Sequence, residues 1–225
     1  MSWVLDSLDL IGALLLAHLW QSLAPVALGL LISVPLGWIA WRYRLLRGGI
    51  VIVTGLLYTI PSLALLTILP GILGLPVNSE ANLVAALTVY AVALLVRAVV
   101  DGLDSVDGDV RLAASASGFG TVRRLWAVEL PLAAPVVLAG LRVAAASTIA
   151  LATVGILVGV TNLGYLFTNG LQRRILPEVL AGVVAVVLLA VAVDLLLVLA
   201  GRLLLPWRQR LEPAGRRPRR TEALA

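Results

Sequence analysis

Long apolar segments, separated by shorter polar ones, run along almost the whole chain. A helix needs about 20 mostly apolar residues to cross a lipid bilayer. Segments of about this length cover residues 19–41, 49–69, 83–100, 140–160 and 179–201. The pattern therefore predicts an all-α polytopic membrane protein with five transmembrane helices. They form a membrane domain of residues 1–207 that precedes a basic tail of residues 208–225.

The N-terminal segment, residues 1–17, carries Asp6 and Asp9 and lacks the basic start of a cleaved signal peptide. We expect it to form a helix on the outer surface of the membrane, ahead of the first span. In that span, Pro25 and Pro35 each remove a backbone hydrogen-bond donor, so both are expected to bend the helix.

A polar island, residues 111–135, interrupts the apolar pattern. It holds three arginines and Glu129, and each charge at the bilayer centre would cost about 2.5 to 3.5 kcal/mol. We therefore expect a water-facing loop over residues 102–135. Two short helices joined by a corner suit docking into a partner's groove, while an ordinary connecting loop is the alternative.

Local signals divide this loop into two helices. Its alanine-rich start predicts a helix over residues 110–117, and Gly118 and Gly120 allow a sharp turn. A second helix is expected over residues 121–130, stopped by Pro131. The apolar stretch that follows is longer than one span, so residues 132–139 are expected along the inner surface, with the fourth span beginning near Gly140.

A proline breaks the second span at its centre. Pro61 leaves the carbonyl of Leu57 without its usual donor, and polar side chains gather on the same turn: Tyr58, Thr59 and Ser62. Irregular polar backbone at membrane depth is tolerated beside protein or a water-filled path. The turn is a candidate for a translocation route. The alternative is a packed kink, with Ser and Thr bonded back to the backbone.

Further polar residues lie inside other spans. Tyr90 lies in the middle of the third span, and Thr148 in the fourth either lines a path or bonds within its own helix. Asp194 lies inside the fifth span, where a carboxylate needs a partner, and either Arg142 or Arg97 is expected to pair with it. A structural clamp is favoured over a proton relay, because no second acid shares that span.

Composition narrows the function classes. With 61% hydrophobic residues, the chain is not an ordinary soluble domain. All 17 basic residues are arginine, so a phosphate-binding Walker lysine is absent. One His and no Cys leave no zinc cluster or thiol nucleophile. We therefore expect a non-catalytic chain without a cofactor or metal of its own.

The net charge of +5 would also suit a nucleic-acid-binding protein, but the arginines gather at the ends of apolar segments and in the tail. That distribution is typical of membrane topology. Apart from Arg173 and Arg174, all fall on the cytoplasmic side if the N-terminus is outside and the C-terminus cytoplasmic. The tail is expected to touch lipid head groups or to act as a stop-transfer signal.

The polar island resembles the signature of ABC-importer permeases. That signature reads Glu-Ala-Ala, three residues, Gly, nine residues, an aliphatic residue, one residue, then Leu-Pro. The matching positions, all in register, are Ala113, Ala114, Gly118, Val128, Leu130 and Pro131. Leu112 stands where the family usually has Glu. In this family the loop forms coupling helices that sit in a cleft of a cytoplasmic ATPase subunit.

Three further phrases resemble the permeases of osmoprotectant importers for glycine betaine, carnitine and choline. They are YTIPSLALL (58–66), AGLRVAAASTIALATVG (139–155) and NLGYLFTNGLQR (162–173). The resemblance implies a multi-pass subunit of the bacterial inner membrane, paired with an identical or paralogous permease. It also implies two ATPase subunits, which would hold ATP and Mg²⁺, and an extracytoplasmic binding protein.

The expected function is therefore ATP-driven import of a quaternary-ammonium solute by alternating access. Such a cation is held by aromatic faces, which Tyr58 and Tyr90 would supply. A permease for an amino acid or another small solute is the nearest alternative. An ATP-independent secondary transporter would need paired halves or coupling acids, and only Asp194 qualifies. An intramembrane enzyme would need a nucleophile with a base, or a metal cluster.

Overall fold

The computed structural model describes residues 2–207, which are helical nearly throughout and contain no strand. In chain order the elements are α1 (Ser2–Asp6), α2 (Leu8–Arg42), α3 (Arg44–Leu57), α4 (Ser62–Leu73), α5 (Glu80–Asp104), α6 (Gly108–Ala116), α7 (Thr121–Arg124), the π-helical turn η1 (Leu125–Glu129), α8 (Leu130–Ala152), the 3₁₀ segment η2 (Thr153–Val158), α9 (Gly164–Gln172) and α10 (Leu176–Leu204). The predicted tail, residues 208–225, lies outside the described residues.

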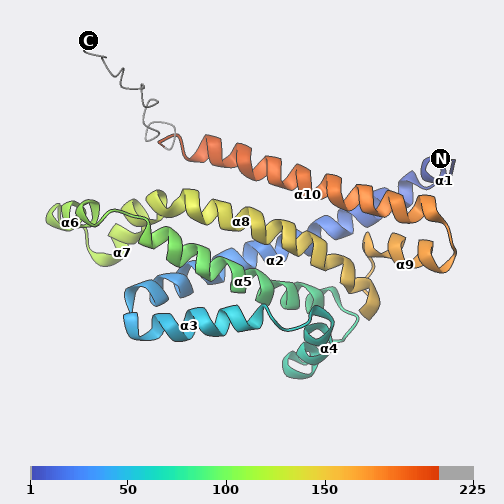
Figure 1. Ribbon diagram of the computed structural model, residues 1–225, viewed down its shortest axis with the longest axis horizontal. Helices are drawn as coiled ribbons and strands as arrows, with labels where there is room; N and C mark the ends of the chain where they lie inside the picture. The colour runs from blue at the N-terminus through green and yellow to red at the C-terminus, as the bar shows by residue number, and fades with distance from the viewer. Residues whose placement is uncertain (1, 208–225) are drawn as a thin grey trace, which may run out of the picture.

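Helix α5 forms the centre of an elongated bundle, with α2 and α8 packed along it (Figure 1). Small residues allow these close approaches. A Cβ atom on Gly29 of α2 would lie 2.5 Å from the Cβ of Ala91, and one on Gly140 of α8 would lie 2.3 Å from the Cβ of Ala98. Side chains along α5 are accordingly buried, among them Leu83, Leu95, Val96, Val99 and Leu103.

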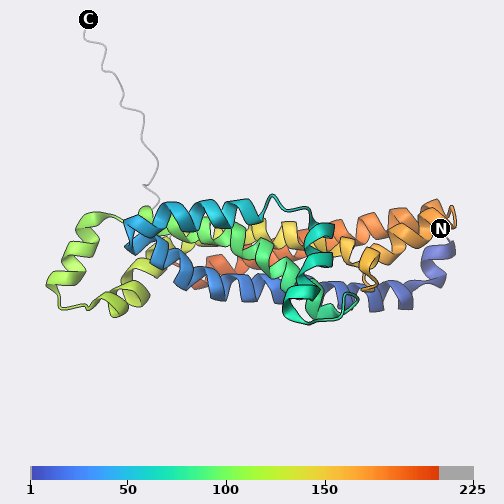
Figure 2. The same ribbon diagram turned by 90° about the horizontal axis from the view of Figure 1, so that it is seen from below.

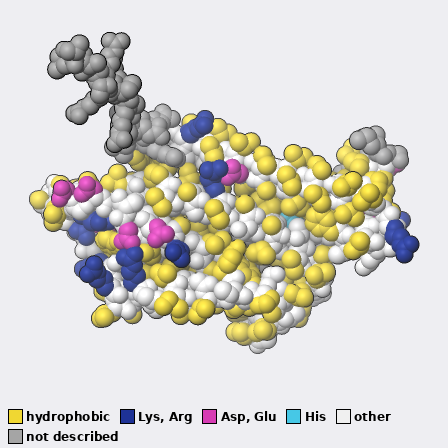
Figure 3. All heavy atoms as spheres, in the orientation of Figure 1, with side chains coloured by type: hydrophobic (Ala, Val, Ile, Leu, Met, Phe, Trp, Pro, Cys, Tyr) yellow, Lys and Arg dark blue, Asp and Glu magenta, His cyan; other side chains and the backbone are white. Residues whose placement is uncertain are grey.

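Four helical stretches among the described residues are long and apolar enough to cross a membrane, and a fifth span is possible if α3 and α4 count as one. Helices α3 and α4 meet at an angle of 109° across the break at residues 58–61. On the face shown in Figure 3, apolar side chains cover the middle of the molecule, and most charged ones gather at the end that carries α6 and α7. This distribution fits a bilayer around the middle of the bundle.

The start of the first long helix differs from the prediction. Instead of a separate surface helix over residues 1–17, only α1 is separate, and α2 runs unbroken from Leu8 to Arg42 with Pro25 and Pro35 inside it. Asp9 lies in the first turn of α2, where a negative charge interacts favourably with the helix dipole. Asp9 therefore lies at the beginning of the long helix, while Asp6 is the last residue of α1.

The prediction that Pro131 stops a helix is also wrong. Residues 121–158 form one continuous helical stretch, and nothing breaks it at Gly140. In an α-helix the Pro131 ring would clash with the carbonyl four residues earlier. Here the wider turn η1 precedes it, with the Leu130 amide donating to the carbonyl of Leu125, so the helix continues through the proline.

The remaining predicted spans match helices with shifted ends. The third, predicted over residues 83–100, is α5, and the fifth, predicted over residues 179–201, is α10. The fourth changes from α-helix to η2 after Ala152, and Gly159 then ends it with a left-handed φ of 89°. Helix α9 lies between the fourth and fifth predicted spans, where the sequence predicted no helix.

Candidate functional site

Helices α6 and α7 project beyond the ends of the long helices and form, with η1, one compact unit (Figures 1 and 2). We call residues 108–129 the α6–α7 pair. The Asp107 side chain caps α6 by accepting from the Asp109 amide at 2.8 Å. The corner after α6 needs glycine at Gly118, whose φ is +81°, whereas Gly120 has an ordinary extended conformation. The first predicted helix and the glycine corner are thus present, whereas the second runs through η1 into α8.

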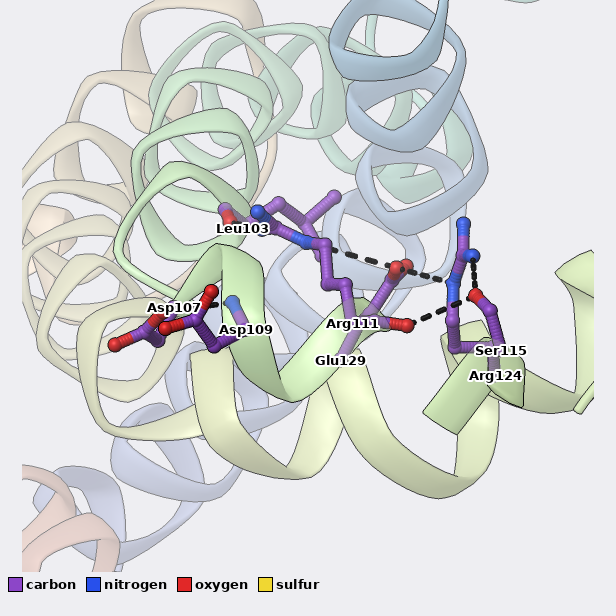
Figure 4. Close-up of polar contacts among 7 residues, drawn as sticks. All are labelled: Leu103, Asp107, Asp109, Arg111, Ser115, Arg124 and Glu129. Atoms are coloured by element: carbon purple, nitrogen blue, oxygen red, sulfur yellow. Dashed lines mark hydrogen bonds and ion pairs between the residues drawn. The ribbon is translucent and has the colours of Figure 1, made fainter. Parts of the chain in front are cut away.

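A buried carboxylate holds the pair together (Figure 4). Glu129 is only 1% exposed, and its Oε1 accepts a 2.8 Å hydrogen bond from Arg124 Nε. Arg124 Nη1 also donates to Ser115 Oγ at 2.7 Å, which ties α7 to α6. A second guanidinium lies nearby, with Arg111 Nε 3.6 Å from the same Glu129 oxygen. The charge of Glu129 is therefore compensated by two arginines inside the pair.

Arg111 also reaches the long helices. Its Nη2 donates to the carbonyl of Leu103 near the end of α5. Its guanidinium carbon lies 4.7 Å from the ring centroid of Trp41, at the end of α2, in a cation–π contact. Arg111 thus makes the polar contacts of the α6–α7 pair with both helices, beside Leu125, which packs in one apolar cluster with Leu103 and Trp41.

Two arginines of the pair are turned inward, while several of its large apolar side chains face outward. The side chains of Arg111 and Arg124 are 19% and 21% exposed. By contrast, Leu112, Val122 and Trp126 are 69%, 64% and 63% exposed. Exposed large apolar side chains on a projecting element are typical of a surface that contacts another protein.

The signature positions lie in different places on this unit. Ala114 is buried against the rest of the pair, whereas Ala113 is exposed. Val128, Leu130 and Pro131 lie where the pair joins α8. Leu112, which replaces the family's usual Glu, points outward and forms no part of the Glu129 cluster.

The break between α3 and α4 lies away from the α6–α7 pair, along the side of the bundle (Figure 1). Thr59 Oγ1 donates to the carbonyl of Leu56 at 2.7 Å, so this hydroxyl is bonded back to its own helix. The Leu57 carbonyl, which Pro61 deprives of its usual donor, accepts instead from the Ile60 amide at 3.4 Å. The Tyr90 hydroxyl donates to the carbonyl of Ile60 and fastens the break to α5.

The predicted path residues separate into an exposed and a buried group. Tyr58 is 42% exposed and Tyr90 4% exposed, and their rings meet edge to face with centroids 5.7 Å apart. Thr59 and Pro61 are exposed and Ser62 is half-buried. Thr148 is buried, and its Oγ1 donates to the Ala144 carbonyl of its own helix at 2.7 Å. Within one chain, the accessible aromatic face at the break belongs to Tyr58.

Asp194 of α10 faces Arg142 of α8. Two parallel hydrogen bonds join them, from Arg142 Nε at 2.6 Å and from Nη2 at 2.7 Å, in the bidentate geometry that favours arginine. Arg97, the other expected partner, lies 3.9 Å from Asp101 on its own helix instead. The ion pair therefore links the two helices across the bundle.

A second polar cluster, which sequence reasoning missed, lies at the end of the bundle opposite the α6–α7 pair. Asn162 Nδ2 donates to Gln21 Oε1 at 2.9 Å and to the Ala152 carbonyl at 2.8 Å, and its Oδ1 accepts from the Gly164 amide at 2.8 Å. Gln21 Nε2 donates in turn to Glu80 Oε1 at 2.9 Å. Gln21 and Asn162 have no exposed surface. The presence of Gln21 inside a predicted span was the one signal of this cluster.

Among residues 2–207, no three His, Asp or Glu side chains lie close enough together to hold a metal ion. The candidate site consists of the α6–α7 pair, the break between α3 and α4, and the contacts that connect them to the bundle.

Comparisons with known proteins agree with this arrangement. The family described as "Binding-protein-dependent transport system inner membrane component" matches residues 20–210. The chain is 32% identical to the osmoprotectant import permease protein OsmW of Salmonella typhimurium over 197 residues, which cover 87% of this chain and 92% of OsmW. It is also 32% identical to the choline transport system permease protein OpuBB of Bacillus subtilis over 189 residues, 84% of this chain and 86% of that protein.

The fold is similar to that of a solved importer. A chain of the MetNI methionine ABC transporter, in an inward-facing conformation, superposes with a TM-score of 0.80 and 18% sequence identity, covering 88% of this chain and 98% of that chain. At this identity the likeness concerns the fold alone. The chain therefore belongs to the family of binding-protein-dependent transport system inner membrane components, has the fold of an ABC-importer permease and is a transport subunit.

Proposed function

We propose that this chain is the permease subunit of an ATP-driven importer for quaternary-ammonium osmoprotectants such as glycine betaine, carnitine and choline. The observation that carries the proposal is the similarity, along nearly the whole chain, to permeases named for osmoprotectants, for choline and for glycine betaine, carnitine and choline. A solute-binding partner is implied by the family itself.

The chemistry of the α3–α4 break suits such a solute. A quaternary ammonium has no proton to donate, so aromatic faces attract it more effectively than hydrogen-bond acceptors do. Tyr58, exposed at the break, is the direct contact we assign to the translocation path, together with Thr59, Pro61 and Ser62. Tyr90 acts behind it by holding the break, and Thr148 lies deeper. Contacts of this kind are weak, which permits release.

The α6–α7 pair is assigned to docking on a separate ATPase subunit that binds ATP and Mg²⁺. Its exposed residues Leu112, Val122 and Trp126 suit a groove with an apolar lining. Leu112 would make there an apolar contact instead of the ionic one that a glutamate would make. The complete importer would contain two ATPase subunits, a second permease that is identical or paralogous, and an extracytoplasmic binding protein.

Orientation follows from charge. The arginines that flank the spans gather at the end that carries the α6–α7 pair, among them Arg42, Arg44 and Arg47. This end is therefore placed in the cytoplasm and the N-terminus outside, in the bacterial inner membrane. In the alternating-access cycle, closure of the ATPases would draw the α6–α7 pairs together and expose the break first to one side and then to the other.

Substrate-stimulated ATP hydrolysis tests the proposal. The chain would be purified through an affinity tag with its ATPase, reconstituted in liposomes with the binding protein, and assayed with betaine, carnitine, choline, methionine and other amino acids. Stimulation by the quaternary ammonium solutes supports the proposal. Stimulation by an amino acid alone would assign the chain to the nearest alternative, and transport without any ATPase would indicate a secondary transporter.

A matched pair of variants tests the path. Tyr58→Phe keeps the aromatic face and should transport at close to the wild-type rate, whereas Tyr58→Leu should raise the solute concentration for half-maximal uptake about 3- to 10-fold, since a cation–π contact contributes about 0.5 to 1 kcal/mol or more. Equal uptake by the two variants would show that the aromatic ring of Tyr58 does not contact the solute during transport.

A further inference from the structure

The α6–α7 pair contacts the helices that would have to move at two places, the buried side chain of Leu125 in η1, which packs in one apolar cluster with Leu103 and Trp41, and Arg111 in α6. Helix α6 packs mainly against α7 and η1, which belong to the same unit. Arg111 is the residue of α6 whose side chain reaches beyond this unit. It contacts Leu103 of α5 and Trp41 of α2, as well as Glu129 of η1. One residue of α6 thus contacts three other elements, two of which are long helices of the bundle.

Each of these contacts uses a different property of the guanidinium group. An N–H donates to the Leu103 carbonyl, the positive charge lies beside the Glu129 carboxylate, and the planar group lies over the Trp41 ring (Figure 4 for the first two). Arginine is the one side chain that offers a rigid fork of donors, a permanent charge and a stacking face together. Lysine would keep the charge and lose the fork and the planar face.

The contact with Glu129 is loose. Arg111 Nε is buried and has no hydrogen-bond partner, although it lies 3.6 Å from Glu129 Oε1, an oxygen that already accepts from Arg124 at 2.8 Å. A buried donor within reach of an acceptor leaves room for a small displacement that would complete the bond. Glu129 can therefore shift between its two arginines while remaining paired.

We propose that Arg111 is a positioning residue that couples displacement of the α6–α7 pair to α2 and α5. When the pair moves, the hydrogen bond from Arg111 to the Leu103 carbonyl and the contact of its guanidinium with the Trp41 ring move the cytoplasmic ends of α5 and α2 with it. The proposal rests on the proposed function, in which an ATPase displaces the pair. The role differs from docking, because Arg111 is turned inward while Leu112 is turned outward.

The experiment compares uptake per ATP hydrolysed in the complete reconstituted complex. Arg111→Gln should still co-purify with the ATPase and hydrolyse ATP at about the wild-type basal rate, while uptake per ATP falls about 10-fold, within the range seen for residues that carry coupling between sites. Arg111→Lys should recover part of the loss. The matched control is Arg97→Gln, which removes an exposed arginine of α5 whose pairing is confined to its own helix, and it should leave uptake per ATP unchanged.

A second variant removes the other partner of the contact between Arg111 and Trp41. Trp41→Leu changes no residue of the α6–α7 pair, keeps an apolar side chain beside Leu125 and removes the stacking face, so uptake per ATP should fall about 3-fold, as expected for the loss of one cation–π contact. This variant also decides the matter if Arg111→Gln fails to assemble.

Three results would overturn the inference. Unchanged uptake per ATP in Arg111→Gln and Trp41→Leu would exclude coupling through Arg111. A parallel loss of hydrolysis and uptake in both variants would indicate that Arg111 only maintains the fold of the pair. If the wild-type complex itself shows no solute-stimulated hydrolysis, the proposed function fails, and the inference fails with it for that separate reason.

Discussion

The two ends of the bundle are closed by different chemistry. At the α6–α7 end the contacts are ionic: Arg111 and Arg124 surround Glu129, and Arg47 pairs with Asp104 through side chains that are 39% and 40% exposed. At the opposite end the contacts centre on the hydrogen bonds of two fully buried amides, Gln21 and Asn162, with Gln21 donating also to the Glu80 carboxylate.

This difference bears on which end can move. A buried amide with three directed hydrogen bonds loses them when its neighbours shift, and each unsatisfied group costs about 1 to 3 kcal/mol. Long arginine side chains follow a displaced carboxylate with little loss, since Coulomb attraction depends weakly on direction. We infer that the end of the bundle that carries Gln21 and Asn162, the amide end, stays fixed during transport. The end that carries the α6–α7 pair accommodates the motion.

The largest effect is expected at the fixed end. Asn162→Leu would leave Gln21 Oε1, the Ala152 carbonyl and the Gly164 amide without their partner, at a cost of about 2 to 4 kcal/mol in the free energy of unfolding. Thermal unfolding of the purified complex would measure it. Thr67→Val, which removes an exposed hydroxyl bonded within its own helix, is the control. A small effect at Asn162 would contradict the assignment of this end as fixed.

A local effect is expected at the α6–α7 pair. Glu129→Gln removes the buried charge between two arginines, so we expect about 1 to 3 kcal/mol of lost stability confined to this unit. Hydrogen exchange of residues 108–129 should quicken while the amides of α5 keep their protection. If the whole molecule lost stability equally, the pair would be an integral part of the bundle.

The Asp194–Arg142 pair tests whether an ionic contact in the middle of the bundle serves as a clamp. Asp194→Asn alone should lower the yield of assembled complex, because Arg142 then lacks its counter-charge. Replacing both residues by apolar ones, Arg142→Met with Asp194→Leu, should restore much of the yield. Unchanged assembly in Asp194→Asn and in Arg142→Gln would exclude the clamp.

The smallest effect is expected at Arg47. Its pair with Asp104 is partly exposed, so Arg47→Gln should change the stability by at most about 1 kcal/mol, and the difference from wild type should shrink at high salt. Thermal unfolding at low and high ionic strength provides the comparison. A large, salt-independent loss would show that this end is held as firmly as the amide end.

Much of this architecture was accessible from the sequence, because membrane insertion depends on the length and hydropathy of segments. The family and fold inferred from the loop signature are confirmed by the comparisons, and the glycine corner at Gly118 is present because only a residue without Cβ adopts its φ easily. Hydropathy likewise identified Asp194 as a residue that needs a partner.

The errors arose where one residue's effect depends on its surroundings. Pro131 usually ends a helix, but a single π turn accommodates it. The role of Tyr90 in the path stays a prediction; what the sequence did not reveal is that packing buries its ring and that its hydroxyl donates to the Ile60 carbonyl. The Glu129 cluster joins side chains of α6, α7 and η1 that meet only because the chain turns at the glycine corner, so periodicity alone did not reveal it.

The π turn has one more consequence. A π turn holds an extra residue compared with an α turn, and each residue of an α-helix turns the chain by about 100°. The surplus residue in Leu125–Glu129 therefore sets the azimuth at which α7 leaves α8. Deleting Ala127 would remove only one small residue and keep the segment helical, yet it would rotate Arg124 away from Glu129. The length of this segment is therefore itself under constraint.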